Sequence, residues 1–294
     1  MGKNIWLLIL LAVFLTACNV GNAEKNTGES DTEQKKPEND SEPLGHEDEK
    51  EKKLSDENAV EKDEPEVSEP ENKEKAYKIN DETSSVIPLN EKVSEKVALL
   101  TIDDAPHTYS LEMAKTLKRM NANAIFFVNG HFLDTPEEKE ILKQIHNMGF
   151  MIGNHTFDHA FLPDLSKQEQ KEQIVSLSDK VEEIIGERPV FFRAPNGANT
   201  EYSKQVAREN GMVVMNWTYG YDYFKPYMNA EKLTEAMVTG KGPEVGVGYS
   251  LLKPGANLLM HDREWTATAL DDIINGLRES GYSIVDPKLI KTIQ

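Results

Sequence analysis

The stretch Val97-Ala98-Leu99-Leu100-Thr101-Ile102-Asp103-Asp104 places a nearly unbroken apolar run directly before two carboxylates. A short apolar run of this kind is typical of a strand that is buried on both faces, as in a parallel sheet. In α/β folds the functional side chains gather where parallel strands end. This stretch therefore predicts a parallel α/β domain, although an Asp-Asp pair before a proline is also an ordinary turn.

Downstream of this strand, short apolar runs alternate with longer amphipathic stretches. Helices are predicted at residues 111–119, 136–148, 166–185 and 267–280. Further strands are predicted at residues 124–128, 150–153, 190–192, 213–216, 257–260 and 282–285. Repeated strand–helix alternation indicates parallel strands with crossover helices, so a (β/α) barrel and an open doubly wound sheet both fit. No glycine-rich nucleotide motif follows the first strand.

Upstream of the domain the composition changes. Residues 21–80 contain 20 Asp or Glu and 10 Lys or Arg, a net charge of −10, which leaves −18 − (−10) = −8 for the rest. Such a segment cannot bury enough apolar surface to offset the entropy of ordering. We expect residues 19–80 to be a disordered acidic tether and residues 81–294 to be the domain. Composition does not separate a leash that gives reach from a solubilising tail.

The first eighteen residues resemble a targeting signal. Lys3 is followed by an apolar run over residues 5–15, which is shorter than the roughly 20 residues of a membrane-spanning helix. The sequence Leu15-Thr16-Ala17-Cys18 resembles the lipobox of bacterial lipoproteins. Lipidation at Cys18 would anchor the chain to a membrane without spanning it. The alternative is an ordinary signal peptide that contains a cysteine.

Composition excludes several classes of protein. The 294 residues carry a formal charge of −18 and contain one cysteine. An acidic chain lacks the basic footprint that nucleic-acid binding requires. One cysteine cannot build a disulfide scaffold or a cysteine-rich zinc module.

Histidines after the third predicted strand suggest a metal site. His155 and His159 are four residues apart, which puts both imidazoles on one side of a helical turn. Together with Asp104 they form a set of two histidines and one carboxylate, which leaves coordination positions open for water and substrate. Two unrelated surface histidines remain the alternative.

Two more polar segments follow predicted strands. Arg193 could pair with a carboxylate, and the following turn, Pro195-Asn196-Gly197, could aim backbone N–H groups at a ligand. His261 follows the strand at residues 257–260 and would share the same rim. Taken in isolation, Arg193 would be a surface arginine before a routine turn, and His261 would be a structural histidine.

In order and spacing, these segments resemble the polysaccharide deacetylase (NodB-type) domain of carbohydrate esterase family 4. The matching motifs are Thr101-Ile-Asp-Asp-Ala-Pro106, His155-Thr-Phe-Asp-His159, Arg193-Ala-Pro-Asn-Gly197 and Leu259-Met-His261-Asp. The resemblance covers about residues 95–290. It implies a distorted (β/α) barrel, a divalent metal that is most often Zn²⁺, and removal of acetyl groups from N-acetylated sugars.

The resemblance also implies a role for each matching residue. Asp104, His155 and His159 correspond to metal ligands, and Asp103 to the general base that takes a proton from the attacking water. Arg193 corresponds to the group that orients Asp103. His261 corresponds to the general acid for the leaving amine. The backbone N–H of Asn196, which follows Pro195, would stabilise the oxyanion.

Three positions depart from the family pattern. Ala105 stands where glycine is usual, and Asn196 where an aromatic residue is common. The motif Asp-x-x-Asp-Trp has no clean match. We assign its carboxylate, which tunes His261, to Asp222, and an aspartate with no such role is the alternative. Trp217 and Tyr223 could stack on sugar rings.

The expected function is a metal-dependent N-deacetylase of a cell-wall or extracellular polysaccharide, with peptidoglycan favoured. Chemistry independent of the family agrees, because amide hydrolysis needs an activated nucleophile, charge stabilisation and a proton for nitrogen. An O-acetyl esterase and a catalytically weak wall-binding lipoprotein are the rival readings. We expect a monomer, anchored outside the cytoplasm and facing the cell wall.

Overall fold

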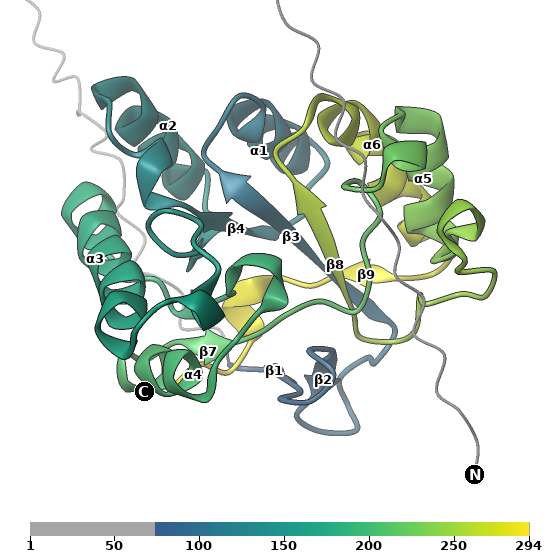
Figure 1. Cartoon of the computed structure of the whole chain (residues 1–294). Helices are drawn as coiled ribbons and strands as arrows, with labels where there is room; N and C mark the ends of the chain where they lie inside the picture. Colours follow the sequence, from purple (N-terminus) through teal and green to yellow (C-terminus); the bar gives the residue numbers. More distant parts are fainter. Residues whose placement is uncertain (1–73, 294) are drawn as a thin grey trace, which may run out of the picture. The chain divides into compact units, whose positions relative to one another are not determined.

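The computed structural model describes residues 74–293. Its main element is a seven-stranded parallel sheet in the order β7-β6-β5-β4-β3-β8, with β9 also paired to β3. The strands are β3 (Val97–Ala105), β4 (Ala124–Val128), β5 (Met151–Asn154), β6 (Phe191–Phe192), β7 (Val213–Val214), β8 (Ala256–His261) and β9 (Ser283–Ile284). The sheet is curled into a half-barrel, which is an α/β fold of the predicted type (Figure 1).

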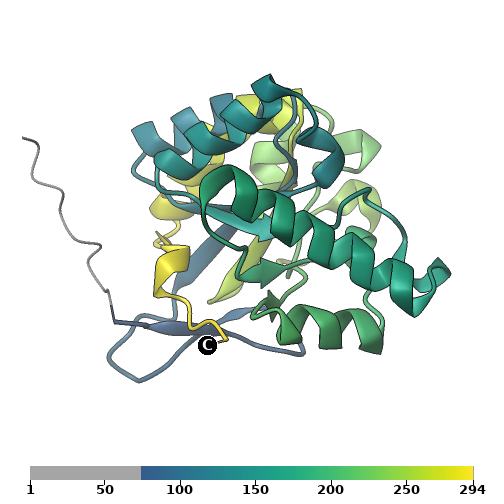
Figure 2. The same ribbon diagram turned by 90° about the vertical axis from the view of Figure 1, so that its left-hand side faces the viewer.

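Helices pack on the outside of the curled sheet (Figures 1 and 2). They are α1 (Ser110–Arg119), α2 (Pro136–Asn147), α3 (Lys167–Ile185), α4 (Glu201–Glu209), α5 (Ala230–Thr239) and α6 (Glu264–Glu279). Within the described residues no helix has the length and apolar character needed to cross a membrane. The proposed signal, Cys18 and most of the proposed tether lie outside the described residues.

The chain after β7 brings the far edge of the sheet to β8. The backbone N–H of Thr218 donates to the carbonyl of Asn257 over 2.8 Å, and that of Leu259 donates to Tyr219 over 2.9 Å. These bonds make a parallel bridge between Tyr219 and Leu258. They turn the sheet towards a barrel and away from an open doubly wound arrangement. The barrel is distorted, because β6 and β7 are only two residues long.

Side chains of β3 alternate between two apolar layers. Ala98, Leu100 and Ile102 join the large core cluster that includes the buried faces of α1 and α6. Val97 and Leu99 join a second cluster with residues of β4 and β6. Because successive side chains of a strand point to opposite faces, Thr101 and Asp103 continue the second row and reach the end of the barrel interior. The strand pattern thus sets the direction of Asp103.

Helix starts follow their sequence signals. Thr135 and Ser166 each cap a helix through a capping box, with Glu138 and Glu169 as the reciprocal partners. The long helix α3 ends at Gly186, which has a left-handed backbone with φ 78°. The helices and strands that were predicted between residues 97 and 285 are confirmed, apart from small differences at their ends.

A small antiparallel pair precedes the barrel. Strand β1 (Tyr77–Ile79) pairs with β2 (Val86–Pro88), and Tyr77 also bridges to Ile290 near the end of the chain. Neither strand was predicted, and β1 lies before the boundary that we placed at residue 81. Strand β7 ends at Val214, two residues earlier than predicted. The backbone N–H of Asn216 donates to the side chain of Ser84 over 2.9 Å instead of to a neighbouring strand.

Candidate active site

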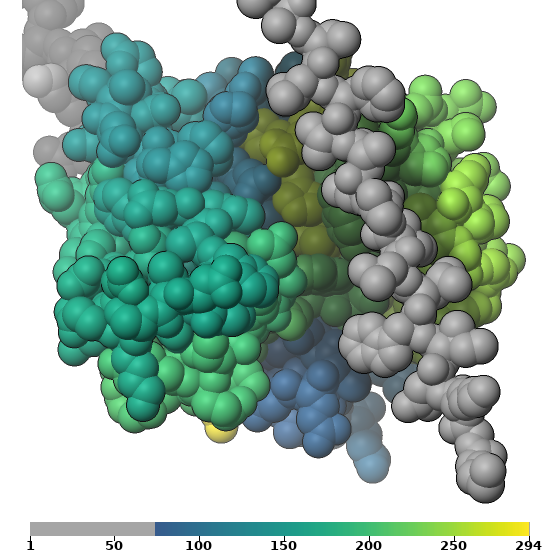
Figure 3. Space-filling view, in the orientation of Figure 1, coloured from purple at the N-terminus to yellow at the C-terminus, as the bar shows by residue number. Residues whose placement is uncertain are grey.

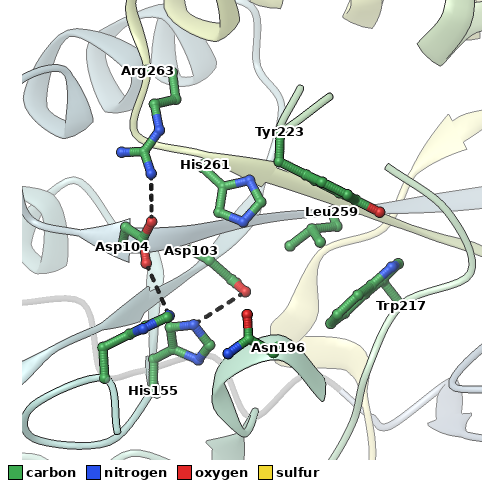
Figure 4. A pocket seen from close by; sticks show the side chains of 10 residues that line it. Asp103, Asp104, His155, Asn196, Trp217, Tyr223, Leu259, His261 and Arg263 are labelled. Carbon is green, nitrogen blue, oxygen red and sulfur yellow. Dashed lines mark hydrogen bonds and ion pairs between the residues drawn. The ribbon is translucent and has the colours of Figure 1, made fainter. Parts of the chain in front are cut away.

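A cavity of about 330 Å³ opens where β3, β5 and β8 end. Figure 3 shows the surface hollowed between the teal segments and the olive residues around β8 and α6. The cavity is lined by Asp103, Asp104, His155, His159, Asn196, Trp217, Tyr223, Leu259, His261 and Arg263 (Figure 4). Most of these residues were singled out from the sequence, so the four motifs do converge on one place.

Asp104, His155 and His159 present a compact set of metal-binding atoms. One possible ligand atom from each residue lies within 4.8 Å of the others. An oxygen of Asp104 is 3.6 Å from Nε2 of His159. Donor atoms about 2 Å from a tetrahedral zinc ion lie roughly 3.3 Å apart, so little movement would be needed to surround one. The residues therefore fit a divalent metal.

The buried imidazole of His155 is in the right state for a ligand. Its Nδ1 lies 2.7 Å from the backbone oxygen of Arg193, so Nδ1 carries the proton and Nε2 keeps a free lone pair. Burial lowers the pKa of His155, and the neighbouring carboxylates oppose this only in part. The imidazole is therefore neutral at pH 7, as metal binding requires.

Asp103 is held by the fully buried Arg193. Nη1 of Arg193 donates to Asp103 over 2.6 Å and to the hydroxyl of Thr101 over 2.8 Å. Its Nη2 donates to the carbonyl of Asn216 over 2.7 Å. The guanidinium also lies over the ring of Phe127, 4.3 Å from its centre. These contacts fix the orientation of the Asp103 carboxylate, whose other oxygen is 3.5 Å from Nε2 of His155.

His261 faces the cavity with a carboxylate behind it. Its Nδ1 is 2.7 Å from Asp222, whose second oxygen accepts the His261 backbone N–H over 2.6 Å and the Thr266 hydroxyl over 2.8 Å. Burial alone would lower the pKa of His261, but attraction and hydrogen bonding to Asp222 outweigh it and raise the pKa to about 9. The imidazole is therefore protonated at pH 7 and able to act as an acid.

The remaining predicted residues differ in exposure. Asn196 has a left-handed backbone, with φ 56° and ψ 14°, and its side chain lies in the cavity. Pro195 is buried and is absent from the cavity lining. Trp217 and Tyr223 form one wall, and the half-exposed ring of Tyr223 stands edge-on to His261 at 5.7 Å.

One charged residue of the cavity, Arg263, was missed from the sequence, and Asp262 was quoted there as part of a motif without a role. Arg263 lines the cavity and donates to Asp104 over 2.9 Å. The buried Asp262 accepts the backbone N–H groups of Tyr109 and Ser110, which fixes the loop after β3. Their position directly after His261, at the end of a strand, was the available signal.

The chain is similar in sequence to known polysaccharide deacetylases. Residues 90–215 match the family model described as polysaccharide deacetylase. A peptidoglycan-N-acetylglucosamine deacetylase of Listeria monocytogenes is 32% identical over 229 residues, which are 74% of this chain and 46% of that protein. A peptidoglycan-N-acetylmuramic acid deacetylase of Bacillus subtilis is 28% identical over 193 residues, 64% of this chain and 69% of that protein. This chain thus spans less than half the length of the Listeria relative.

Solved structures give the same picture of the fold. A peptidoglycan deacetylase of Bacillus subtilis has a TM-score of 0.55 and 28% identity, over 65% of this chain and 87% of that one. A pseudoenzyme of carbohydrate esterase family 4 from Bacillus anthracis has a TM-score of 0.56 and 26% identity, over 64% of this chain and 62% of that one. Motifs, fold and relatives agree that residues 90–215 belong to a polysaccharide deacetylase domain, with the fold of carbohydrate esterase family 4.

Proposed function

We propose that this chain is a metal-dependent hydrolase that removes N-acetyl groups from amino sugars of peptidoglycan. One observation carries the proposal. A base candidate, Asp103, and an acid candidate, His261, line the same cavity as the compact set Asp104, His155 and His159. Relatives that act on peptidoglycan sugars, by their names, support the choice of substrate.

Different residues of the cavity carry out different steps of amide hydrolysis. A divalent metal, which we take to be Zn²⁺, would supply Lewis-acid polarisation and a more acidic water. Asp103, oriented by Arg193, accepts the proton of the attacking water. The backbone N–H of Asn196 donates to the oxygen of the tetrahedral intermediate.

Collapse of that intermediate needs a proton on nitrogen, because an amine anion is a very poor leaving group. His261 carries this proton at pH 7, since Asp222 raises its pKa to about 9. Trp217 and Tyr223 line the wall beside it, where apolar ring faces can pack on a sugar. This need for a proton donor favours N-acetyl over O-acetyl substrates, because an alkoxide leaves more readily than an amine anion.

A second candidate, a wall-binding protein with little activity, is favoured by one comparison. A family member of the same fold from Bacillus anthracis is described as a pseudoenzyme. The intact carboxylate pair and histidines of the present chain argue for catalysis instead.

The location of the protein belongs to the same proposal. Lipidation of Cys18 and an acidic tether would hold a monomeric domain outside the cytoplasm, within reach of the cell wall. Labelling of expressed protein with a radioactive fatty acid, compared with a Cys18→Ala variant, tests the anchor. Label that persists in the variant would contradict it.

Mass spectrometry of digested peptidoglycan tests the activity. The purified zinc-loaded protein should lower the mass of wall fragments by 42 Da, which is the loss when one acetyl group is replaced by hydrogen. The variant Asp103→Asn should leave these masses unchanged. Acetate release from N-acetylglucosamine oligomers should also exceed release from O-acetylated xylan. Unchanged fragment masses, with zinc bound, would favour the wall-binding alternative.

A further inference from the structure

Arg263 lies in the same cavity but has no step in the proposed reaction. It lies two residues after the end of β8 and is the N-cap residue of α6. Its Nη2 donates to Oδ2 of Asp104 over 2.9 Å (Figure 4). Its Nη1 donates to the backbone oxygen of Asp262 over 3.1 Å. Although the side chain is 40% exposed, both ends of the guanidinium are therefore bound to the protein.

The two oxygens of Asp104 meet different partners. Oδ1 is 3.6 Å from Nε2 of His159, on the side of the candidate metal position, while Oδ2 is bound by Arg263. A carboxylate can bind a cation through one oxygen or through both. With Oδ2 engaged, only Oδ1 is directed towards the two histidines.

The adjacent carboxylates have separate arginines. Asp103 pairs with the buried Arg193 over 2.6 Å, and Asp104 pairs with Arg263 over 2.9 Å. Asp104 also has a left-handed backbone, with φ 62°, which separates the directions of the two side chains. Arginine adds orientation as well as charge to a carboxylate contact. Each arginine therefore holds its carboxylate in one orientation.

We propose that Arg263 is a positioning residue for the metal site, which holds Oδ2 of Asp104 so that Asp104 binds the metal through Oδ1 alone. This inference rests on the metal site of the proposed function. It assigns to the arginine an effect on the ion itself, apart from any contact with substrate. Residues that bind the far side of a metal ligand commonly change metal affinity by about 10–100-fold.

Metal binding without substrate tests the inference. Zn²⁺ affinity is measured by competition with a chromophoric chelator, and the coordination of Co²⁺ is read from its visible spectrum. Arg263→Met should weaken Zn²⁺ binding by about 10–100-fold and alter the Co²⁺ spectrum, because both Asp104 oxygens become free. Arg263→Lys, which keeps the charge but offers one compact donor, should give an intermediate loss. Arg119→Met is the matched control, since Arg119 pairs with Asp271 on α6 and is absent from the cavity lining.

Other outcomes would overturn the inference. Unchanged Zn²⁺ affinity and an unchanged Co²⁺ spectrum in Arg263→Met would do so, and a loss of turnover alone would then point to a substrate contact. Tighter Zn²⁺ binding would show that repulsion of the cation outweighs positioning. If Arg263→Met fails to fold, Arg263→Lys is judged by the same two measurements. Wild-type protein that binds Zn²⁺ but releases no acetate would reject the proposed function and leave this inference standing.

Discussion

Asp103 and Asp104 are neighbours in the chain, yet their surroundings prepare them for different chemistry. Asp103 belongs to the inward row of β3 and meets the buried Arg193, whereas Asp104 has a left-handed backbone and turns towards His159 and Arg263. A carboxylate that accepts a proton must stay free of the metal, and one that binds the metal must face it. The change in backbone direction between the two residues meets both needs.

His261 gives the most direct test at the residue scale. We predict that His261→Ala lowers the rate of deacetylation by about 10²–10⁴-fold, the usual span for an acid–base residue. Bound zinc should be unchanged, because His261 is outside the set formed by Asp104, His155 and His159. Acetate release and elemental analysis measure the two quantities. Near-normal turnover would remove His261 from the mechanism.

Asp222 should control the pH at which His261 loses its proton. In the metal-free protein we expect NMR titration to give a His261 pKa of about 9. The pKa should be much lower in Asp222→Asn, because burial is then opposed only by the weaker attraction of Asp103 and Asp104. The folded pKa lies above the unfolded value of about 6.5. This pair therefore stabilises the fold fully below pH 6.5 and loses that contribution as the pH rises through about 9. Equal pKa values in the two proteins would contradict the assignment.

At the scale of elements, Asp262 ties the end of β8 to the start of α1. Its carboxylate accepts three backbone N–H groups over 2.7–3.0 Å, from His107 and Tyr109 before α1 and from Ser110, the first residue of α1. The carboxylate itself is buried, with Asp262 only 1% exposed. A helix is thus capped by a residue about 150 positions away in sequence.

Removal of that cap should destabilise the domain. We predict that Asp262→Ala lowers the free energy of unfolding by about 2–4 kcal/mol, from the lost cap together with buried N–H groups left without acceptors. Urea unfolding followed by circular dichroism measures the change. Asp271→Ala is the control, since this more exposed carboxylate of α6 pairs only at the surface with Arg119, and it should change stability by less than about 0.5 kcal/mol. Similar losses in both variants would contradict the capping role.

For the molecule as a whole, local sequence patterns predict the helices and strands well, but they do not predict how the sheet closes towards a barrel. The run at residues 97–102 predicts β3, and cap signals mark α2 and α3, because these depend on neighbours in sequence. Helices α4 and α5 were missed although Thr200 and Asn229 cap them, because their apolar stripes are short. The choice between barrel and open sheet rests on the bridge from Tyr219 to Leu258. No local sequence pattern indicates a contact between residues so far apart in the chain.

The site residues show the same contrast between what neighbours in sequence predict and what only the folded chain shows. The spacing of His155 and His159 indicates a shared ligand, and the structure brings Asp104 to them. The predicted helical turn is wrong, because residues 155–159 form a loop in which Thr156 and His159 have left-handed backbones. The sequence has no clean match to the family's fourth motif, and we assigned its carboxylate to Asp222 with an aspartate of no such role as the alternative. The structure places Asp222 against His261. Arg263 was missed because a charged residue that begins a helix is ordinary, and only the folded chain shows that it meets Asp104.

Metal removal tests the whole molecule, because one ion would join Asp104 near the end of β3 to two histidines that follow β5. We predict that exhaustive chelation abolishes acetate release and lowers the melting temperature, and that added Zn²⁺ restores both. A ligand at 100 times its dissociation constant stabilises a fold by about 2.7 kcal/mol, so the thermal shift should grow with the free zinc concentration. The variant His159→Ala, which lacks one ligand, should show a much smaller shift at the same zinc concentration. Full activity after chelation, with no zinc detected by elemental analysis, would exclude a metal-dependent reaction.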